Sequence, residues 1–470
     1  MKYAFSTAAA LLATFSLTLA ADAPTCSPTQ KCPDSAPCCS QYGQCGVGAY
    51  CLGGCDPESS FDLQSCVAAP TCKSGDFKLD SLDDVAANTV YLGDASKANW
   101  VSSGKPVTYN GDSILLTMAP STVGTLLSST HYVWYGKISA TMTTSQGQGV
   151  VTAFILMSDV KDEIDFEFVG DDVTHAQSNY YWQGVTDYHN MVPLDTSDTR
   201  SNTHTYTIDW TPDQVTWSID GNSMRTLKKS DTWNSSTNSY HFPQTPARVQ
   251  LSLWPAGLES NGEGTVSWAG GLVNWDSQYM QNGYYYAMVN DVSIECYDPP
   301  DGYTNNGDKS YYYMDTLGTN SSVAIGNNDT ILSSFMATGD NPSFDPNAKP
   351  SGTSSSKTNS ATSSSASISA TPESVPGISG GGNMASSNGA PAGDANGNTG
   401  TGSSGSSGSG SGSGTDSSAA SQSSASSGSS GFSQGGSSSG SGSGSSSDAP
   451  KIVAGSAVAL LGFFVAALMI

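Results

Sequence analysis

Residues 161–170 read KDEIDFEFVG and place three acidic side chains at every second position. Because side chains alternate between the two faces of a β-strand, Glu163, Asp165 and Glu167 share one face, and the apolar residues after them share the other. A solvated strand face usually mixes Lys, Thr and Ser, since aligned like charges repel one another. We therefore expect the apolar side to anchor this strand in a core and the acids to perform chemistry.

Cleavage of a glycosidic bond with retention of configuration asks for such acids. One carboxylate attacks the anomeric carbon and one carboxylic acid protonates the leaving oxygen, with the two carboxyl groups about 5–5.5 Å apart. A third acid between them would hydrogen-bond the nucleophile and help to set both pKa values. Residues four apart on a flat strand lie about 13 Å apart at Cα, so this chemistry requires a curved sheet.

The elements that would position these acids are short strands spread over residues 72–298. Segments of alternating apolar and polar residues are YGKISATM (135–142), VVTAFILM (150–157), TYTIDW (205–210), VTWSID (215–220), RVQLSLW (248–254) and NDVSIEC (290–296). Asp220-Gly221 is a pair typical of hairpin turns. Long helical periodicity is absent. The pattern predicts an all-β fold, a β-jelly-roll sandwich of two antiparallel sheets with a concave cleft.

A second strand offers polar groups to the same cleft. In ARVQLSLWP, alternation places Arg248, Gln250, Ser252 and Trp254 on one face. A polar face that ends in tryptophan suits a sugar, since it supplies hydrogen-bond donors and one ring for stacking.

Cysteines divide the chain into a small module and a larger domain. Eight of the ten lie close together: Cys26, Cys32, Cys38, Cys39, Cys45, Cys51, Cys55 and Cys66. Residues 22–68 are too few for an ordinary core, so disulfides must hold them. The remaining two, Cys72 and Cys296, would join the start and the end of the next domain. A zinc site is the less favoured alternative, because no histidine lies near the cluster.

The segment CCSQYGQCGVGAYC (38–51) resembles the hevein-type chitin-binding domain, carbohydrate-binding module family 18. The resemblance implies that Ser40, Tyr42 and Tyr50 contact the sugar, although Gln44 stands where the family usually has a second aromatic residue. It also implies a set of disulfides: Cys26 with Cys39, Cys32 with Cys45, Cys38 with Cys51, and Cys55 with Cys66. The alternative is a stapled spacer that binds nothing.

DEIDFEF resembles the signature of glycoside hydrolase family 16, a β-jelly-roll family of retaining enzymes, and the likeness extends over most of 72–298. With its module, its Ser-rich stalk and its C-terminal tail, the chain resembles fungal Crh-type cell-wall transglycosylases, which link chitin to β-glucan. The resemblance implies that Glu163 is the nucleophile, Glu167 the general acid/base and Asp165 the helper.

The same resemblance points to the residues that contact the substrate. They are Glu167, Gln250, Trp254 and Thr265. Arg248, from the alternation of its strand, and Tyr181, in the aromatic segment NYYWQG, are further candidates. For Trp268, the alternatives of a core position and a cleft position stay open.

Both ends of the chain carry targeting patterns. Residues 1–20 read as a secretory signal peptide. Residues 299–350 are expected to be a poorly ordered transition, and residues 351–447 a Ser/Gly-rich stalk. Residues 448–470 read as a GPI-attachment signal that the mature protein loses, with a C-terminal membrane helix as the alternative. We expect a secreted protein that is GPI-anchored at the cell surface or linked to the cell wall.

Composition narrows the partners. The formal charge of −24 argues against nucleic acid, since phosphate binding needs clustered basic residues. The histidines are scattered without metal-ligand spacing, and the mechanism requires neither a metal nor a cofactor. We expect a monomer that meets the membrane only through its anchor. Asn234, Asn320 and Asn328 begin sequons for N-linked glycans.

The favoured function is that of a retaining transglycosylase that cleaves chitin and transfers it to β-glucan or chitin, with hydrolysis of chitin as a side activity. The alternatives are an endo-β-1,3-glucanase, a non-catalytic chitin-binding adhesin and a structural wall protein. The three acids cannot separate transfer from hydrolysis, because both reactions share the first step.

Overall fold

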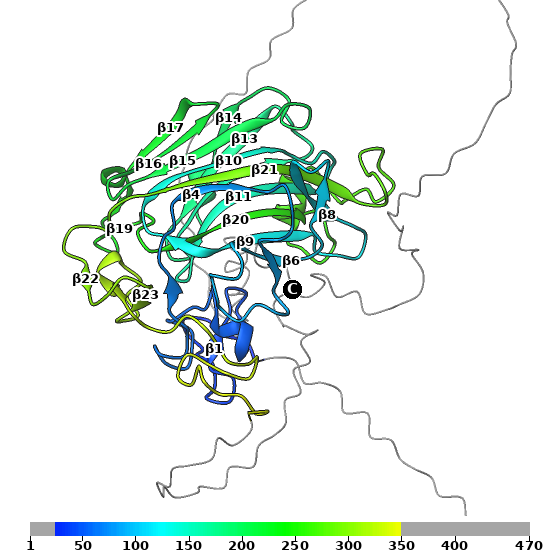
Figure 1. Cartoon of the computed structure of the whole chain (residues 1–470). Coiled ribbons are helices and arrows are strands. Elements are labelled where there is room, and N and C mark those ends of the chain that lie inside the picture. The colour runs from blue at the N-terminus through cyan, green and yellow to red at the C-terminus, as the bar shows by residue number, and fades with distance from the viewer. Residues whose placement is uncertain (1–23, 349–470) are drawn as a thin grey trace, which may run out of the picture. The chain divides into compact units, whose positions relative to one another are not determined.

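The computed structural model describes residues 24–348, which form an almost entirely β-stranded molecule. Two large sheets of eight strands each are built mainly from antiparallel pairs (Figure 1). We call the sheet that contains the three acids the acid-bearing sheet and the other the outer sheet. The acid-bearing sheet runs, in spatial order, through β14 (Val192–Asp195), β13 (His175–Tyr181), β12 (Glu163–Val169), β11 (Val150–Ser158), β20 (Ala247–Pro255), β9 (Thr125–Val133), β6 (Trp100–Ser103) and β5 (Val85–Ala87).

The outer sheet contains the longest strand described, β21, which pairs with three others. The outer sheet runs through β17 (Asn222–Lys228), β16 (Gln214–Ile219), β15 (His204–Trp210), β10 (Gly136–Thr143), β21 (Tyr285–Cys296), β8 (Ser113–Met118) and β7 (Val107–Tyr109), and β4 (Gly75–Lys78) also pairs with β21. Each of the six segments predicted to be strands forms one, so the all-β prediction is confirmed.

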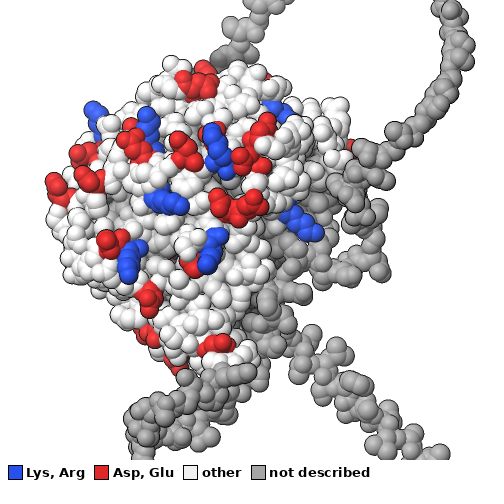
Figure 2. Space-filling view, in the orientation of Figure 1, with Lys and Arg blue, Asp and Glu red and all other residues white. Residues whose placement is uncertain are grey.

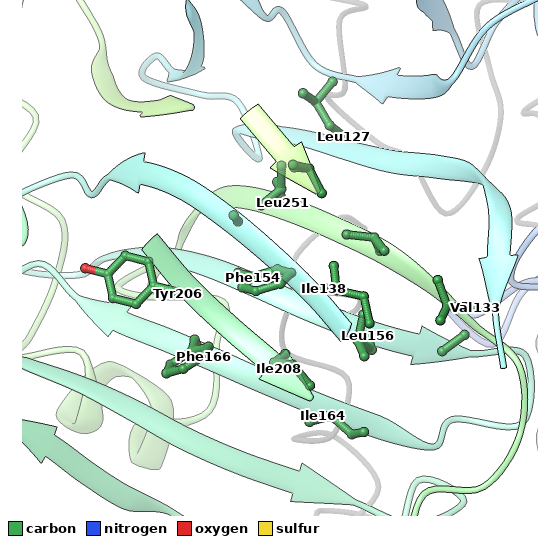
Figure 3. Close-up of a cluster of buried hydrophobic side chains, with 14 of the residues drawn as sticks. Leu127, Val133, Ile138, Phe154, Leu156, Ile164, Phe166, Tyr206, Ile208 and Leu251 are labelled. Carbon is green, nitrogen blue, oxygen red and sulfur yellow. The ribbon is translucent and has the colours of Figure 1, made fainter. Parts of the chain in front are cut away.

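The main core lies between the two sheets. Phe154, Ile164 and Phe166 of the acid-bearing sheet meet Tyr206 and Ile208 of the outer sheet (Figure 3). The rings of Phe166 and Tyr206 lie 5.5 Å apart. Strand β12 is thereby anchored by its apolar side, as the alternation of its sequence predicts.

The hairpin between β16 and β17 shows how local sequence fixes the register. Asp220 and Gly221 have φ angles of 51° and 79°. Both positive values belong to the tight hairpin turn that Asp-Gly favours. The turn therefore confirms the hairpin predicted from this pair.

The N-terminal module has little regular structure and is held by cystines. It contains β1 (Cys38–Cys39), β2 (Cys45–Gly46) and the 3₁₀-helix η1 (Gly48–Cys51). Its disulfides join the pairs implied by the hevein resemblance: Cys26–Cys39, Cys32–Cys45, Cys38–Cys51 and Cys55–Cys66. A fifth disulfide, Cys72–Cys296, ties the chain just before β4 to the last residue of β21.

The expectation of a poorly ordered transition over residues 299–350 is wrong for the part that the structure describes. Tyr311, Val323 and Ile325 are buried against the main core. The few apolar residues of this segment are thus enough to order it. The segment forms a small sheet with the chain that follows the module: β22 (Thr304–Asn305), β24 (Val323–Gly326), β23 (Ser310–Tyr313) and β3 (Ala69–Pro70).

Beyond β24 the chain returns to the module. Leu332 packs with Leu52 and Ala337, and the Gly48 N–H donates to the Ala337 carbonyl at 2.8 Å. We call residues 330–340 the strap. The remaining short elements are η2 (Tyr188–Asn190), η3 (Lys229–Thr232), β18 (Trp233–Asn234), β19 (Ser239–Tyr240), α1 (Glu263–Trp268) and η4 (Asn320–Ser322).

The predicted signal peptide, stalk and GPI signal (1–20, 351–447 and 448–470) lie outside the described residues. Within residues 24–348, no helix has the length and apolar character needed to cross a membrane.

The strap gives the first prediction. Leu332 is 1 % exposed, so Leu332→Ala should lower the free energy of unfolding by about 2–5 kcal/mol through lost burial and a cavity. Its neighbour Ile331 is 46 % exposed, and Ile331→Ala should change it by less than about 0.5 kcal/mol. Urea unfolding of the full chain measures both. Equal effects would mean that the strap does not pack in solution.

Candidate active site

Strand β12 presents Glu163, Asp165 and Glu167 on the face turned away from the outer sheet, which we call the acid face. Figure 2 shows acidic and basic side chains scattered over the surface of one face of the molecule. By contrast, Glu163 is 6 % exposed and Asp165 only 1 %. Burial of neighbouring carboxyl groups is costly, because each ionised form loses its hydration and repels the others.

Strand pairing extends each acid into a row of side chains across the acid face. Register places β13 on one side of β12, and β11 followed by β20 on the other. The rows consist of Tyr181, Glu163, Met157 and Arg248; of Asn179, Asp165, Ile155 and Gln250; and of Gln177, Glu167, Ala153 and Ser252. The structure therefore brings the three acids together with Tyr181, Arg248 and Gln250 on one face.

Burial raises the pKa of all three carboxyl groups. Desolvation raises the pKa of Glu163 well above its usual value, and the charges of Asp165 and Glu167 add to it. Desolvation and the charge of Asp165 do the same to the pKa of Glu167. The pKa of Asp165 rises to about 7, again through burial, against the opposing charge of Arg225. The three groups titrate as a coupled set, so near neutral pH the site can hold a proton donor beside an ionised carboxylate.

Two tryptophans border the Glu167 end of the acid face. The rings of Trp254 and Trp268 lie 6.1 Å apart at 29°. The Trp268 indole N–H donates to Gln177 Oε1 at 2.8 Å. Both rings belong to an apolar cluster on the acid face, not to the core between the sheets. Trp268 therefore lies outside the core between the sheets, and its role as a sugar contact stays a prediction.

Two buried hydroxyl groups on this side have no hydrogen-bond partner among the described residues. They are Ser252 Oγ on β20 and Thr265 Oγ1 on α1. Buried hydroxyls are normally paired. A ligand rich in hydroxyl groups could supply the missing bonds, which fits the sugar-contacting role expected of Thr265.

Comparisons with known proteins agree with this geometry. Residues 94–270 match the family model "Glycosyl hydrolases family 16". The chain is 57 % identical over 337 residues to Crh-like protein 3 of Botryotinia fuckeliana, which covers 72 % of this chain and 75 % of the relative. It is 53 % identical to Crh-like protein 2 of Aspergillus fumigatus, over 70 % of this chain and 75 % of the relative. The chain belongs to the Crh-like proteins of glycosyl hydrolase family 16.

A solved structure described as "Crh5 transglycosylase in complex with NAG" is 31 % identical, with a TM-score of 0.45 over 56 % of this chain and 95 % of that one. Membership of the family makes the protein a glycoside-cleaving enzyme. The acids on β12 are its only row of three alternating carboxyl groups on one strand face among the described residues.

Arg248 lies on the acid face, as a substrate contact would, and its guanidinium group also contacts the module. Its Nε donates to the Ser129 carbonyl at 3.1 Å, and its Nη1 to the Gly53 carbonyl of the module at 2.9 Å. The guanidinium group therefore fastens the module to the acid-bearing sheet. Gln250 is predicted to contact the sugar. Its side-chain Nε2 donates to Oε1 of Gln41 in the module at 3.4 Å.

Ser40, Tyr42 and Tyr50 of the module are all buried, between 7 and 9 % exposed. Tyr42 joins the apolar cluster of the acid face. Sequence reasoning gave the module its own sugar site and did not foresee this contact. Separation along the chain hides it, since no local pattern reports on docking between two segments.

Arg225 on β17 was also missed. Its guanidinium group donates to the carbonyls of Ser178 and Asn190, each at 2.8 Å, and stacks 4.5 Å from the Trp217 ring. Its charge lowers the pKa of Asp165. A lone arginine in an alternating strand carries no sign of such a role.

The raised pKa of Asp165 predicts a pH-dependent stability. The folded protein holds this proton more tightly than the unfolded chain, so the stabilisation is present below about pH 4 and is lost as the pH rises through about 7. Asp165→Asn cannot ionise, and should raise the free energy of unfolding more at about pH 8 than at about pH 5. Urea unfolding measures this, with the exposed Asp171→Asn as control. Equal changes at both pH values would contradict the buried-charge account.

Proposed function

We propose that the protein is a retaining transglycosylase that cleaves chitin and transfers the released chain to β-glucan or chitin in the fungal cell wall. The observation that carries the proposal is the row of the buried Glu163 and Asp165 and the half-buried Glu167, surrounded by polar and aromatic side chains. Hydrolysis of chitin is a side activity of the same site.

In the first step, the Glu163 carboxylate attacks the anomeric carbon of the donor. The glycosidic carbon–oxygen bond breaks, and the Glu167 carboxylic acid gives its proton to the leaving oxygen. The products are a glycosyl ester on Glu163 and a carboxylate at Glu167. The pKa of Glu167 is raised, as a general acid requires. Because the three carboxyl groups titrate as a coupled set, the row can hold a protonated Glu167 beside an ionised Glu163.

In the second step, the Glu167 carboxylate takes a proton from a hydroxyl group of the acceptor. The hydroxyl oxygen attacks the anomeric carbon, and the ester bond to Glu163 breaks. Water in the same place would give hydrolysis. Two inversions at one carbon leave the configuration unchanged.

Asp165 serves both steps from its position between the two glutamates. Its charge adds to the elevated pKa of each neighbour. It becomes easier to protonate as they ionise, so the row can keep its total charge low through the cycle. Gln250, Trp254, Thr265 and Tyr181 are the side chains proposed to hold the donor.

The choice of chitin as donor rests on the hevein-like module and on the family to which the chain belongs. Five disulfides favour an oxidising compartment, which supports secretion. The GPI anchor, the glycans at Asn234, Asn320 and Asn328, and the monomeric state remain part of the proposal.

Transfer can be tested by incubating the secreted enzyme with chitin oligomers and a fluorescent β-glucan oligomer. Mass spectrometry should find fluorescent products heavier by whole N-acetylglucosamine units. Glu163→Gln should reduce their rate of formation by at least about 10³-fold, since it removes the nucleophile.

The exposed Asp171→Asn is the matched control and should retain the wild-type rate. If the chitin is shortened but no labelled product forms, the enzyme hydrolyses chitin and does not transfer it. Cleavage of the glucan alone would instead favour an endo-β-1,3-glucanase.

A further inference from the structure

A cavity of about 100 Å³ lies between the module and the acid-bearing sheet. Its sheet side is formed by side chains of β6, β9 and β20, among them Ser103, Ser128 and Arg248. Register puts these residues on the acid face, since Ser128 pairs with Gln250, and Leu126 pairs with both Ser252 and Ser103. The cavity is therefore a continuation of the face that carries the acids.

The module side of the cavity is formed by the side chains that the hevein resemblance assigns to sugar binding. Ser40, Tyr42 and Tyr50 all line it, together with Gln41. Tyr42 packs against the apolar cluster of the acid face and Tyr50 lines the same cavity, where both rings could stack on the apolar face of a sugar. The module thus points its expected binding side chains at the catalytic domain.

Two hydroxyl groups in this cavity have no hydrogen-bond partner among the described residues. Ser103 Oγ belongs to the sheet side and Tyr50 Oη to the module side. The two residues are only 5 % and 7 % exposed. An orphaned hydroxyl on each wall points to a polar ligand that bonds to both sides.

Hydrogen bonds and an ion pair hold the module against the catalytic domain beside this cavity. The Gly54 N–H donates to Asp159 Oδ1 at 2.8 Å and to the Tyr132 hydroxyl at 3.0 Å. Lys161 and Asp56 form an ion pair of 3.0 Å with side chains 15 % and 3 % exposed. Buried polar contacts of this kind fix one orientation of two surfaces.

We propose that the module and the acid-bearing sheet together form a composite sugar subsite, with one wall from Tyr42 and Tyr50 and the other from Ser103. It takes a ring of the same chitin chain that the acids cleave, and so it rests on the proposed function. The module is then a part of the catalytic cleft and does not anchor a separate polymer.

Strand spacing sets the reach of this subsite. From β12 the sheet passes through β11 and β20 to β9, three spacings or about 14 Å. A sugar ring with its linkage is about as long as one strand spacing, so a chain must extend roughly three rings from the cleaved bond to enter. Short oligomers bound at the acids do not reach it.

Calorimetry on the full chain in a Glu163→Gln background tests the subsite without turnover. The wild-type cavity should bind a chitin hexamer more tightly than a trimer. Tyr50→Phe and Ser103→Ala each remove one oxygen atom, and each should reduce this gain in affinity about two- to tenfold. Tyr109→Phe, at an exposed ring, and Ser102→Ala, on the opposite face, should keep the full gain.

The subsite would be overturned if both variants kept the full gain in affinity for the hexamer over the trimer. It would also be overturned if the variants bound the hexamer more tightly, because the module would then block the cleft. Binding is measured without turnover. The subsite can therefore be confirmed or rejected even if the transfer assay described above fails. Nitration provides a second test: Tyr42 should resist the reagent while Tyr240, 40 % exposed, reacts. Equal nitration of both would show that the module is not docked.

Discussion

The crowding of three carboxyl groups on one strand, two of them buried and the third half-buried, is the constraint on which the rest of the structure depends. Glu163, Asp165 and Glu167 lose hydration and repel one another, so the fold must hold them in place at a cost. The aromatic core beneath Phe166 meets that cost by burying the other side of the same strand. The elevated pKa values that result are what makes acid and base chemistry available near neutral pH.

Sequence patterns predicted the features that depend on local alternation. The strands, the shared face of the acids and the Asp220-Gly221 hairpin follow from side-chain period and turn chemistry. The disulfide pairs came only from a family resemblance. Contacts between distant segments were not predictable, because they depend on three-dimensional packing. Arg225 against Trp217 and Ser178, and Leu332 against the module, have no local signature.

The segment after residue 298 is a second case in which the sequence alone did not predict the structure. Its composition suggested little order, yet Tyr311, Val323 and Ile325 join the main core and the strap holds the module. Once the module is docked, Arg248 and Gln250 face it as well as the acids. The module, the strap and the acid-bearing sheet thus pack against one another as one continuous body.

Trapping of the covalent intermediate tests the division of labour on β12 most directly. A nitrophenyl chitooligosaccharide needs no acid to release its leaving group, so Glu167→Ala should still form the ester on Glu163 and then accumulate it. Intact-protein mass spectrometry should show a gain of one glycosyl chain, placed on Glu163 by peptide mapping, and none in Glu163→Gln. Label on another residue, or in the Glu163→Gln variant, would contradict the account.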